Sequence, residues 1–237
     1  MKTTFKKIAL TLIVALSLPL GGSGWASAQA NEPGAGNALS FDGNDIVNTN
    51  GLALLNTPNG TIECWIQWSG VISEGHFVIK TANPACCGSH FLTLLSSIPH
   101  VVQWSLYNST YFRATGTTPL IPTEWYHIAA TWGTGGMQIF INGVLEGTNT
   151  YTGTGANTTN PVSIGGWINF PQFFNGQIDE VRIWNTARSQ TEIRNTMCSK
   201  LIGNEPGLVG YWRFDETAGN TYFDSQTNVA PNNGTGF

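Results

Sequence analysis

The sequence predicts an all-β fold, an antiparallel two-sheet β-sandwich of the jelly-roll type with one short peripheral helix. From residue 38 onward, short runs of alternating apolar and polar residues are separated by Gly, Asn, Pro and Ser at roughly ten-residue intervals, as in sandwiches. Helical periodicity is nearly absent. The expected strands are residues 38–41, 61–68, 76–80, 91–95, 101–107, 111–114, 125–132, 137–141, 144–146, 162–164, 176–184 and 208–214.

The N-terminal residues have the pattern of an export signal. Basic residues within the first seven positions precede an apolar run, residues 8–20, and then small residues up to Ala28. This order predicts that residues 1–30 are a cleaved secretory signal peptide and that the protein is secreted. The alternative, a membrane anchor, needs about twenty apolar residues, so we expect no membrane insertion.

The charge of the chain limits its partners. Without the leader, seven basic residues face fourteen acidic ones, and the formal charge moves from −4 to −7. Nucleic acids and anionic membranes require a basic surface, so we expect neither as a partner. Charged residues make up only 10% of the chain, and a surface of uncharged hydrogen-bonding groups suits neutral polar ligands such as glycans.

Four cysteines are expected to be oxidised or buried: Cys64, Cys86, Cys87 and Cys198. Adjacent cysteines rarely pair with each other, so one of Cys86 and Cys87 is expected to reach a distant partner. Disulfide and buried thiol both remain open. The spacing does not support a zinc site.

Three elements have specific local signatures. Residues 61–68 place apolar side chains on one face and Trp65 on the other, which predicts a central strand covered on both sides. Asn142-Gly143 between two alternating runs predicts a tight type I′ hairpin. Ser189 and Glu192 have the spacing of a capping box, which predicts the single short helix. The Asn- and Gly-rich end, residues 228–237, is expected to be loose.

Four stretches in this order, residues 39–45, 61–65, 125–143 and 176–185, together resemble the laminin G-like (concanavalin A-like) jelly-roll modules of secreted bacterial proteins. The resemblance covers residues 38–200 as one domain. Residues 201–237 resemble the segment that often separates consecutive modules. They are expected to form either an extra strand on the sandwich or the start of a further module.

The resemblance also implies a calcium site, because such modules frequently bind Ca²⁺. Hard oxygen ligands from a Gly-containing turn suit this ion, and the candidates are Asp42, Asn44, Asp45 and Asp179. If present, the ion would have a structural role. The alternative is a turn in which Asp42 and Asn44 only cap backbone donors.

A catalytic role is not expected. Glucanases of this fold resemble one another in a strand with the pattern Glu-x-Asp-x-(x)-Glu, whose alternating carboxylates act on one sugar. Here the corresponding strand begins with Gln177, and Val181 or Arg182 occupies the position of the last Glu. Glu180 is adjacent to Asp179 and should point to the opposite face.

The expected ligand-binding residues lie in an aromatic loop and beside a cysteine pair. The loop contains Trp167, Phe170, Phe173 and Phe174, a density of aromatics that marks either an interaction site or a loop folded over the sandwich. His90 follows Cys86-Cys87 and is the histidine of most interest.

These observations predict a secreted, non-catalytic recognition module that binds carbohydrate or an extracellular protein, with Ca²⁺ as a structural cofactor. One alternative is a structural or adhesive spacer in a tandem array. A less favoured one is a glycoside hydrolase of concanavalin A-like fold.

Overall fold

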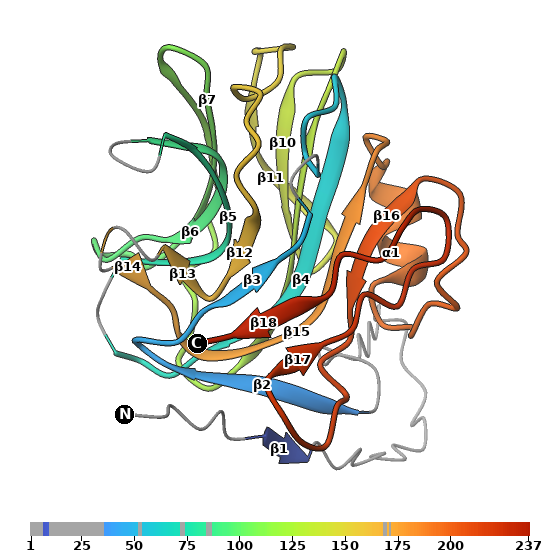
Figure 1. The fold of residues 1–237 in the computed structure, drawn as a ribbon. Coiled ribbons are helices and arrows are strands. Elements are labelled where there is room, and N and C mark those ends of the chain that lie inside the picture. The colour runs from blue at the N-terminus through green and yellow to red at the C-terminus, as the bar shows by residue number, and fades with distance from the viewer. Residues whose placement is uncertain are drawn as a thin grey trace, which may run out of the picture.

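The computed structural model describes residues 7–9, 36–51, 54–71, 74–83, 87–167, 170 and 172–237. Two β-sheets pack face to face, and one short helix lies against the outer side of one of them (Figure 1). The predicted all-β sandwich with a single peripheral helix is confirmed. In the described part of the chain, no helix is long and apolar enough to cross a membrane.

The first sheet has the order β1-β2-β15-β4-β9-β10-β11, and β16 also pairs with β15. All of its strand pairs are antiparallel. Its strands are β1 (Lys7–Ala9), β2 (Asn37–Asp42), β4 (Gly60–Trp68), β9 (Trp125–Trp132), β10 (Met137–Ile141), β11 (Val144–Asn149), β15 (Asn175–Trp184) and β16 (Leu208–Trp212).

The second sheet has the order β17-β18-β3-β12-β5-β6-β7-β8, with the short pair β13 and β14 attached to β5. Among the described strands of this sheet, the contact between β14 and β5 is the only parallel one. Its strands are β3 (Val47–Thr49), β5 (Gly75–Asn83), β6 (Cys87–Leu94), β7 (Val102–Tyr107), β8 (Tyr111–Thr115), β12 (Val162–Ile164), β13 (Gly166–Trp167), β14 (Gln172–Phe173), β17 (Thr221–Tyr222) and β18 (Gly234–Gly236).

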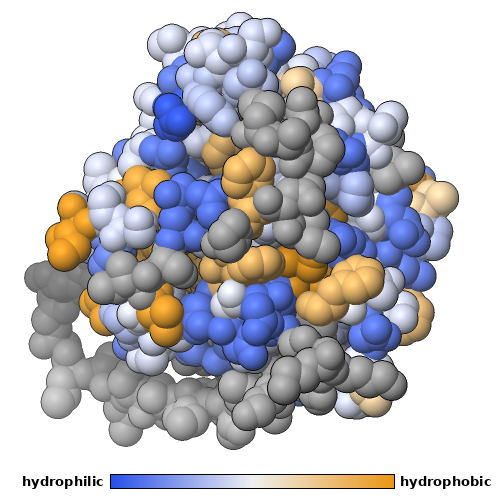
Figure 2. Space-filling view, turned by 60° about the vertical axis from the view of Figure 1, so that its left-hand side comes forward, coloured by the Kyte–Doolittle hydropathy of each residue, from blue (hydrophilic) through white to orange (hydrophobic). Residues whose placement is uncertain are grey.

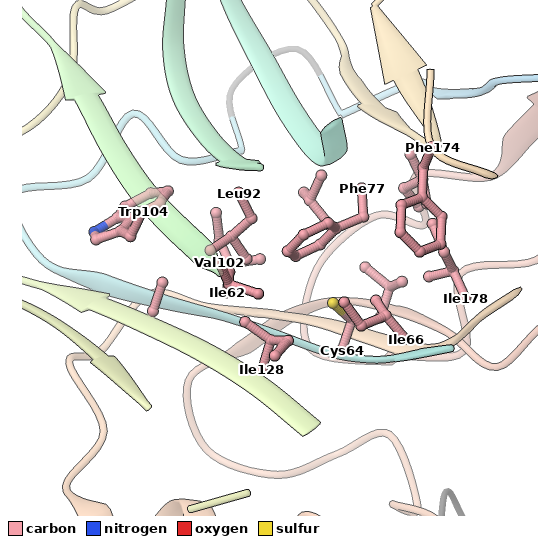
Figure 3. Close-up of a cluster of buried hydrophobic side chains, with 14 of the residues drawn as sticks. Ile62, Cys64, Ile66, Phe77, Leu92, Val102, Trp104, Ile128, Phe174 and Ile178 are labelled. Carbon is pink, nitrogen blue, oxygen red and sulfur yellow. The ribbon is translucent and has the colours of Figure 1, made fainter. Parts of the chain in front are cut away.

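The core lies between the sheets (Figure 3). In β4, the predicted alternation places Ile62, Cys64 and Ile66 in the core, where they face side chains such as Phe77 from the second sheet. The Cys64 thiol is free, and its burial raises its pKa. Cys86 and the side chain of Cys87 lie outside the described part, so the disulfide stays a prediction.

The hairpin and the helix form as predicted and contact each other. Asn142 and Gly143 have φ values of 49° and 70°, as a type I′ turn between β10 and β11 requires. Ser189 caps α1 (Gln190–Thr196) through a capping box with Glu192. Arg194 of α1 donates a hydrogen bond to the Gly143 carbonyl, so the helix holds the hairpin turn.

A buried charge network lies between α1 and the outer face of the first sheet. Glu63 of β4 accepts hydrogen bonds from Arg188 at 3.0 Å and from the Trp184 indole at 2.8 Å. Arg182 lies 3.7 Å from the same carboxylate and also donates to Glu180 at 2.6 Å. Burial alone would raise the pKa of Glu63, but hydrogen bonding to His127 and the two guanidinium groups lower it to about 2.

The C-terminal segment forms strands in both sheets. β16 pairs with residues 181–184 of β15, and β18 pairs with β3. The expectation that residues 228–237 are loose is therefore wrong. The Trp212 indole donates to the Asn232 carbonyl, and Asp224 accepts from the backbone N–H of Asn232, so side-chain hydrogen bonds fix a segment whose composition alone suggested mobility.

We expect Glu63→Gln to lower the free energy of unfolding by about 3–5 kcal/mol, because it leaves buried guanidinium groups without their counter-charge. Urea unfolding followed by tryptophan fluorescence measures this change. Glu124→Gln is the control, because it removes the same charge from an exposed position. An equal effect of the two variants would contradict a structural role of the network.

Candidate functional site

The outer face of β5–β8 is the surface that we consider as the functional site. In these strands the core takes alternate side chains, including Leu92, Val102, Trp104 and Ala114. Their neighbours in sequence therefore point away from the core. We use the name β5–β8 face for these outward side chains: His76, Ile79, Phe91, Thr93, Gln103, Ser105, Tyr107, Tyr111, Arg113 and Thr115.

The strand register arranges this face in rows. One row runs across the four strands in the order Ile79, Phe91, Ser105, Arg113. The next runs in the order His76, Thr93, Gln103, Thr115. Four of these residues, His76, Ile79, Thr93 and Ser105, are buried. The accessible part of the face therefore consists of Phe91, Gln103, Tyr107, Tyr111, Arg113 and Thr115.

The aromatic side chains of the face contact one another. Phe91 lies 5.5 Å from His76 and 5.9 Å from Tyr111 between ring centroids, in edge-on geometry on both sides. Tyr107 lies 4.9 Å from Tyr111. Phe91 and Tyr107 are partly accessible, and Tyr111 is 38% exposed. These rings present a linked aromatic surface that crosses the sheet towards β8.

The pair β13–β14 extends this surface beyond β5. Trp167 lies 6.1 Å from His76, and the Phe170 ring lies 4.4 Å from Trp167. Figure 2 turns this side of the molecule towards the viewer and shows hydrophobic residues interspersed with hydrophilic ones. Of the aromatic loop predicted from the sequence, Phe170 is half-buried beside the β5–β8 face, whereas Trp167 is buried between His76 and Phe170, which corrects its assignment as a ligand-binding residue.

His76 connects the strands beneath the aromatic rings. Its Nδ1 lies 2.7 Å from the Thr93 hydroxyl and its Nε2 lies 3.0 Å from Gln172 Oε1. Since the amide oxygen can only accept, Nε2 carries the proton and Nδ1 accepts from Thr93. Burial lowers the pKa of His76 to about 4, although the bond to Gln172 acts in the opposite direction. The ring is therefore neutral near pH 7 and holds β14 against β5 and β6.

Two of the other candidates, Phe174 and His90, are interior residues, and Phe173 is half-buried. Phe174 is buried in the core, 5.9 Å from Phe77, and His90 is buried beside Trp104. Phe173 is half-buried and packs on Gly166, the residue that pairs with it in β13. His90 and Phe174 are thus interior residues, which corrects their assignment as ligand-binding residues. Strand alternation turned them inward.

The metal candidates are divided between two places. Asp42 and Asp45 lie in one turn, where Asp45 Oδ2 accepts from the Asp42 backbone N–H at 3.0 Å. The other oxygen of Asp45, Oδ1, is buried and has no hydrogen-bond partner among the described residues. Burial and the charge of Asp42 raise the pKa of Asp45 to about 6. Asn44, between them, is exposed.

Asp179 does not join this turn. It lies four residues along β15 from Asn175, the partner of Asp42, which is about 13 Å at the rise of a β-strand. Burial and the neighbouring Glu180 raise the pKa of Asp179, and Asp215 and Lys200 are its other charged neighbours. In the described part of the chain, no group of three or more His, Cys, Asp or Glu could hold a metal ion. The four predicted calcium ligands therefore do not come together in one site.

Several residues of the face were not singled out from the sequence: His76, Phe91, Tyr107, Tyr111 and Arg113. The available signal was the alternation within 91–94, 103–107 and 111–115. Alternation shows that two faces exist. Which face is covered, and which strands are neighbours, depends on the tertiary structure.

Residues 41–194 match the family model described as the concanavalin A-like lectin/glucanases superfamily. The chain belongs to this superfamily. Its members fold as two-sheet sandwiches, so the predicted resemblance is confirmed. No curated protein matches the sequence of this superfamily domain.

Solved structures share its fold. One is a putative carbohydrate binding protein from Bacteroides ovatus, with a TM-score of 0.66 and 22% identity over 84% of this chain and 57% of that one. Another is domain 4 of an extracellular arabinanase from Geobacillus stearothermophilus, solved in complex with arabinotriose, with a TM-score of 0.52 and 16% identity over 68% and 76% of the two chains. The superfamily domain thus spans little more than half of the Bacteroides protein.

A further similar structure is the mouse laminin alpha1 domain pair, with a TM-score of 0.50 and 13% identity over 64% of this chain and 44% of that one. Identities this low show a common fold. They do not show that two proteins bind the same ligand.

We expect the His76 ring to remain neutral down to about pH 4, and Gln172→Leu to lower its pKa further by removing the bond that favours the protonated ring. Titration of the histidine ring signals by NMR measures both values. A His76 pKa near 6.5 in the parent protein would contradict the buried arrangement.

Proposed function

We propose that this chain is an exported, non-catalytic carbohydrate-binding module and that the accessible part of the β5–β8 face, with Phe170 beside it, binds the sugar. The observation that carries the proposal is the group of accessible aromatic rings on three strands, Phe91, Tyr107 and Tyr111, beside the uncharged hydrogen-bonding groups of Gln103 and Thr115. The N-terminal pattern of residues 1–30 supports export.

The chemistry of the face suits a sugar chain. A pyranose or furanose ring has an apolar side of C–H groups, which packs against aromatic rings, and hydroxyl groups around its edge. The half-buried Gln103 and Thr115 lie next to the aromatic row and can exchange hydrogen bonds with hydroxyls. Because the rings are spread over three strands, the face would contact several sugar units of one chain.

Two similar structures support this assignment. The Bacteroides protein is described as a putative carbohydrate binding protein, and the arabinanase domain was solved with arabinotriose. Both share the sandwich with this chain. Their ligands become a proposal here only together with the aromatic face, because the fold by itself does not determine the ligand.

The positions of the carboxylates support a binding role without catalysis. Retaining glycosidases place two carboxyl groups about 5–5.5 Å apart across the scissile bond. The strands β5–β8 contain no Asp or Glu. Glu63 and Glu180, on the other sheet, are buried and engaged by Arg182 and Arg188. Neither carboxylate is available to a substrate.

We expect Phe91→Ala and Tyr111→Ala each to weaken carbohydrate binding about tenfold, because each removes an aromatic surface that a sugar ring would cover. Affinity electrophoresis and titration calorimetry with oligosaccharides selected on a glycan array measure the loss. Phe223→Ala is the matched control, since Phe223 is 56% exposed and lies outside the face.

An equal loss in the control would show that the change is not specific to the face. Absence of binding to any glycan on the array would overturn the proposal. Binding to an extracellular protein instead of a glycan would favour a protein-recognition module. Absence of any binding would favour a structural or adhesive spacer.

We also propose that Ca²⁺ binds at the turn of Asp42 and Asp45 and stabilises it. Two carboxylates in one turn, with one buried oxygen of Asp45 lacking a hydrogen-bond partner, fit the hard oxygen ligands that this ion prefers. A nearby cation would also offset the cost of burying the Asp45 charge. Asp179 is not part of this proposal.

We expect Asp45→Asn to stabilise the calcium-free protein by about 1–2 kcal/mol at pH 8. The folded pKa is raised to about 6, so the ionised carboxylate opposes folding above that pH, and this cost disappears as the pH falls towards 4. The variant should therefore show little advantage at pH 4. Thermal unfolding at both pH values measures the difference, with Glu124→Gln as the control.

Calcium should reverse the order of thermal stability of the parent chain and Asp45→Asn. Added CaCl₂ is expected to raise the Tm of the parent chain and to leave that of Asp45→Asn unchanged. A parent Tm that is the same in CaCl₂ and in EGTA would contradict the calcium proposal and leave the carbohydrate proposal unaffected.

A further inference from the structure

We infer that the β5–β8 face selects carbohydrates that carry a negative charge, as a carboxylate or a sulfate group, and that Arg113 contacts this charge. The inference rests on the proposed function and specifies its class of ligand. Three observations carry it: the position of Arg113 beside the aromatic row, its lack of a carboxylate partner, and the composition of the surrounding strands.

Arg113 lies on β8 within the aromatic surface. In the strand register it follows Phe91 and Ser105 in one row, and its guanidinium lies 4.6 Å from the centroid of the Tyr111 ring. The side chain is exposed. A sugar chain that packs on Phe91 and Tyr111 would therefore meet this cation at the next position.

Arg113 differs from the other cations that follow the predicted leader. Each of the other six donates a hydrogen bond to a carboxylate or to a backbone carbonyl: Lys80 to Asn160, Arg182 to Glu180, Arg188 to Glu63, Arg194 to Gly143, Lys200 to Asp215 and Arg213 to Leu201. Within the part of the chain that the structure describes, no carboxylate lies within 4 Å of the Arg113 guanidinium.

The strands around Arg113 contain no negative charge. Asp and Glu outnumber Lys and Arg by fourteen to ten in the whole sequence, yet β5–β8 contain none of the acidic residues. The other cation in these strands is Lys80, which is buried. A bound anion would therefore meet an exposed cation without opposition from acidic side chains on the same strands.

The geometry of Arg113 suits a planar or tetrahedral oxyanion. Packing of the guanidinium on Tyr111 restrains the side chain and leaves N–H groups at its edge to donate. Two parallel N–H groups can bind a carboxylate or a sulfate bidentately, and such charge-assisted bonds are stronger than those to neutral hydroxyls. Uronic acid units and sulfated sugar units share this chemistry.

The test uses one array with neutral, uronate-containing and sulfated oligosaccharides, probed with the parent chain and three variants. Arg113→Gln removes the charge, and Arg113→Lys keeps the charge but removes the planar fork. Arg194→Gln is the matched control, because it removes one exposed positive charge from α1. All four proteins are compared by circular dichroism to confirm an equal fold.

We expect the parent chain to prefer at least one anionic class over the neutral glycans. Arg113→Gln should lose about tenfold or more in affinity for that class and little for neutral chains, as expected for a charge-assisted pair. The class of glycan for which Arg113→Gln loses affinity, uronate-containing or sulfated, shows which anion Arg113 contacts. Arg194→Gln should bind like the parent.

Three results would overturn the inference, and they separate it from the proposed function. Preference for neutral glycans, or equal binding by the parent and Arg113→Gln, would reject anionic selection while the carbohydrate-binding function stands. Absence of binding to every glycan would reject the proposed function and this inference with it.

Discussion

The charge of Glu63 is the constraint on which the outer side of the first sheet depends. This carboxylate is fully buried in the centre of β4 and is held in its ionised form by Arg188, Arg182 and His127. A buried carboxylate requires such partners, because its desolvation would otherwise cost several kcal/mol. Arg188 precedes α1 and donates to the Glu192 carbonyl within it, so the helix must lie over this part of the sheet.

The same network brings the C-terminal segment into the sandwich. Strand β15 pairs with β2 along residues 175–178 and with β16 along residues 181–184, and Glu180 lies between the two pairings with a φ of 51°. A positive φ is costly for a residue with a side chain. Here it directs the Glu180 carboxylate to Arg182 of β15 and Tyr211 of β16. The change of strand partner is thus coupled to burial of a second carboxylate.

The two sheets differ in what covers them. The helix and the C-terminal segment cover the outer face of the first sheet, and the carboxylates of Glu63 and Glu180 are enclosed there. Among the described residues, β13 and β14 pack on the β5 side of the β5–β8 face, where His76 binds Gln172. Aromatic and uncharged polar side chains remain accessible beyond that pair. This asymmetry is the reason why we propose the second sheet as the binding site.

The amino-acid sequence by itself determined the features that depend on local chemistry. The Asn142-Gly143 turn requires positive φ values, the Ser189 cap satisfies the first N–H groups of α1, and the alternation in residues 61–68 defines a strand buried on both sides. The family pattern depends on such local features, and it predicted the fold correctly. The density of aromatic residues in one loop singled out Trp167 and Phe170, of which Trp167 is buried and a binding role of Phe170 stays a prediction.

The tertiary structure decided which side of each strand is accessible and which strands are neighbours. Phe174 and Phe170 lie in the same loop, yet one enters the core and the other remains near the surface. Asp45 and Asp179 were grouped by residue type, but the strand register separates them. Phe91, Tyr111 and Arg113 come together only because β6, β7 and β8 are adjacent in one sheet. These strands are neighbours because their core-facing sides are buried together. A local sequence pattern does not contain this information.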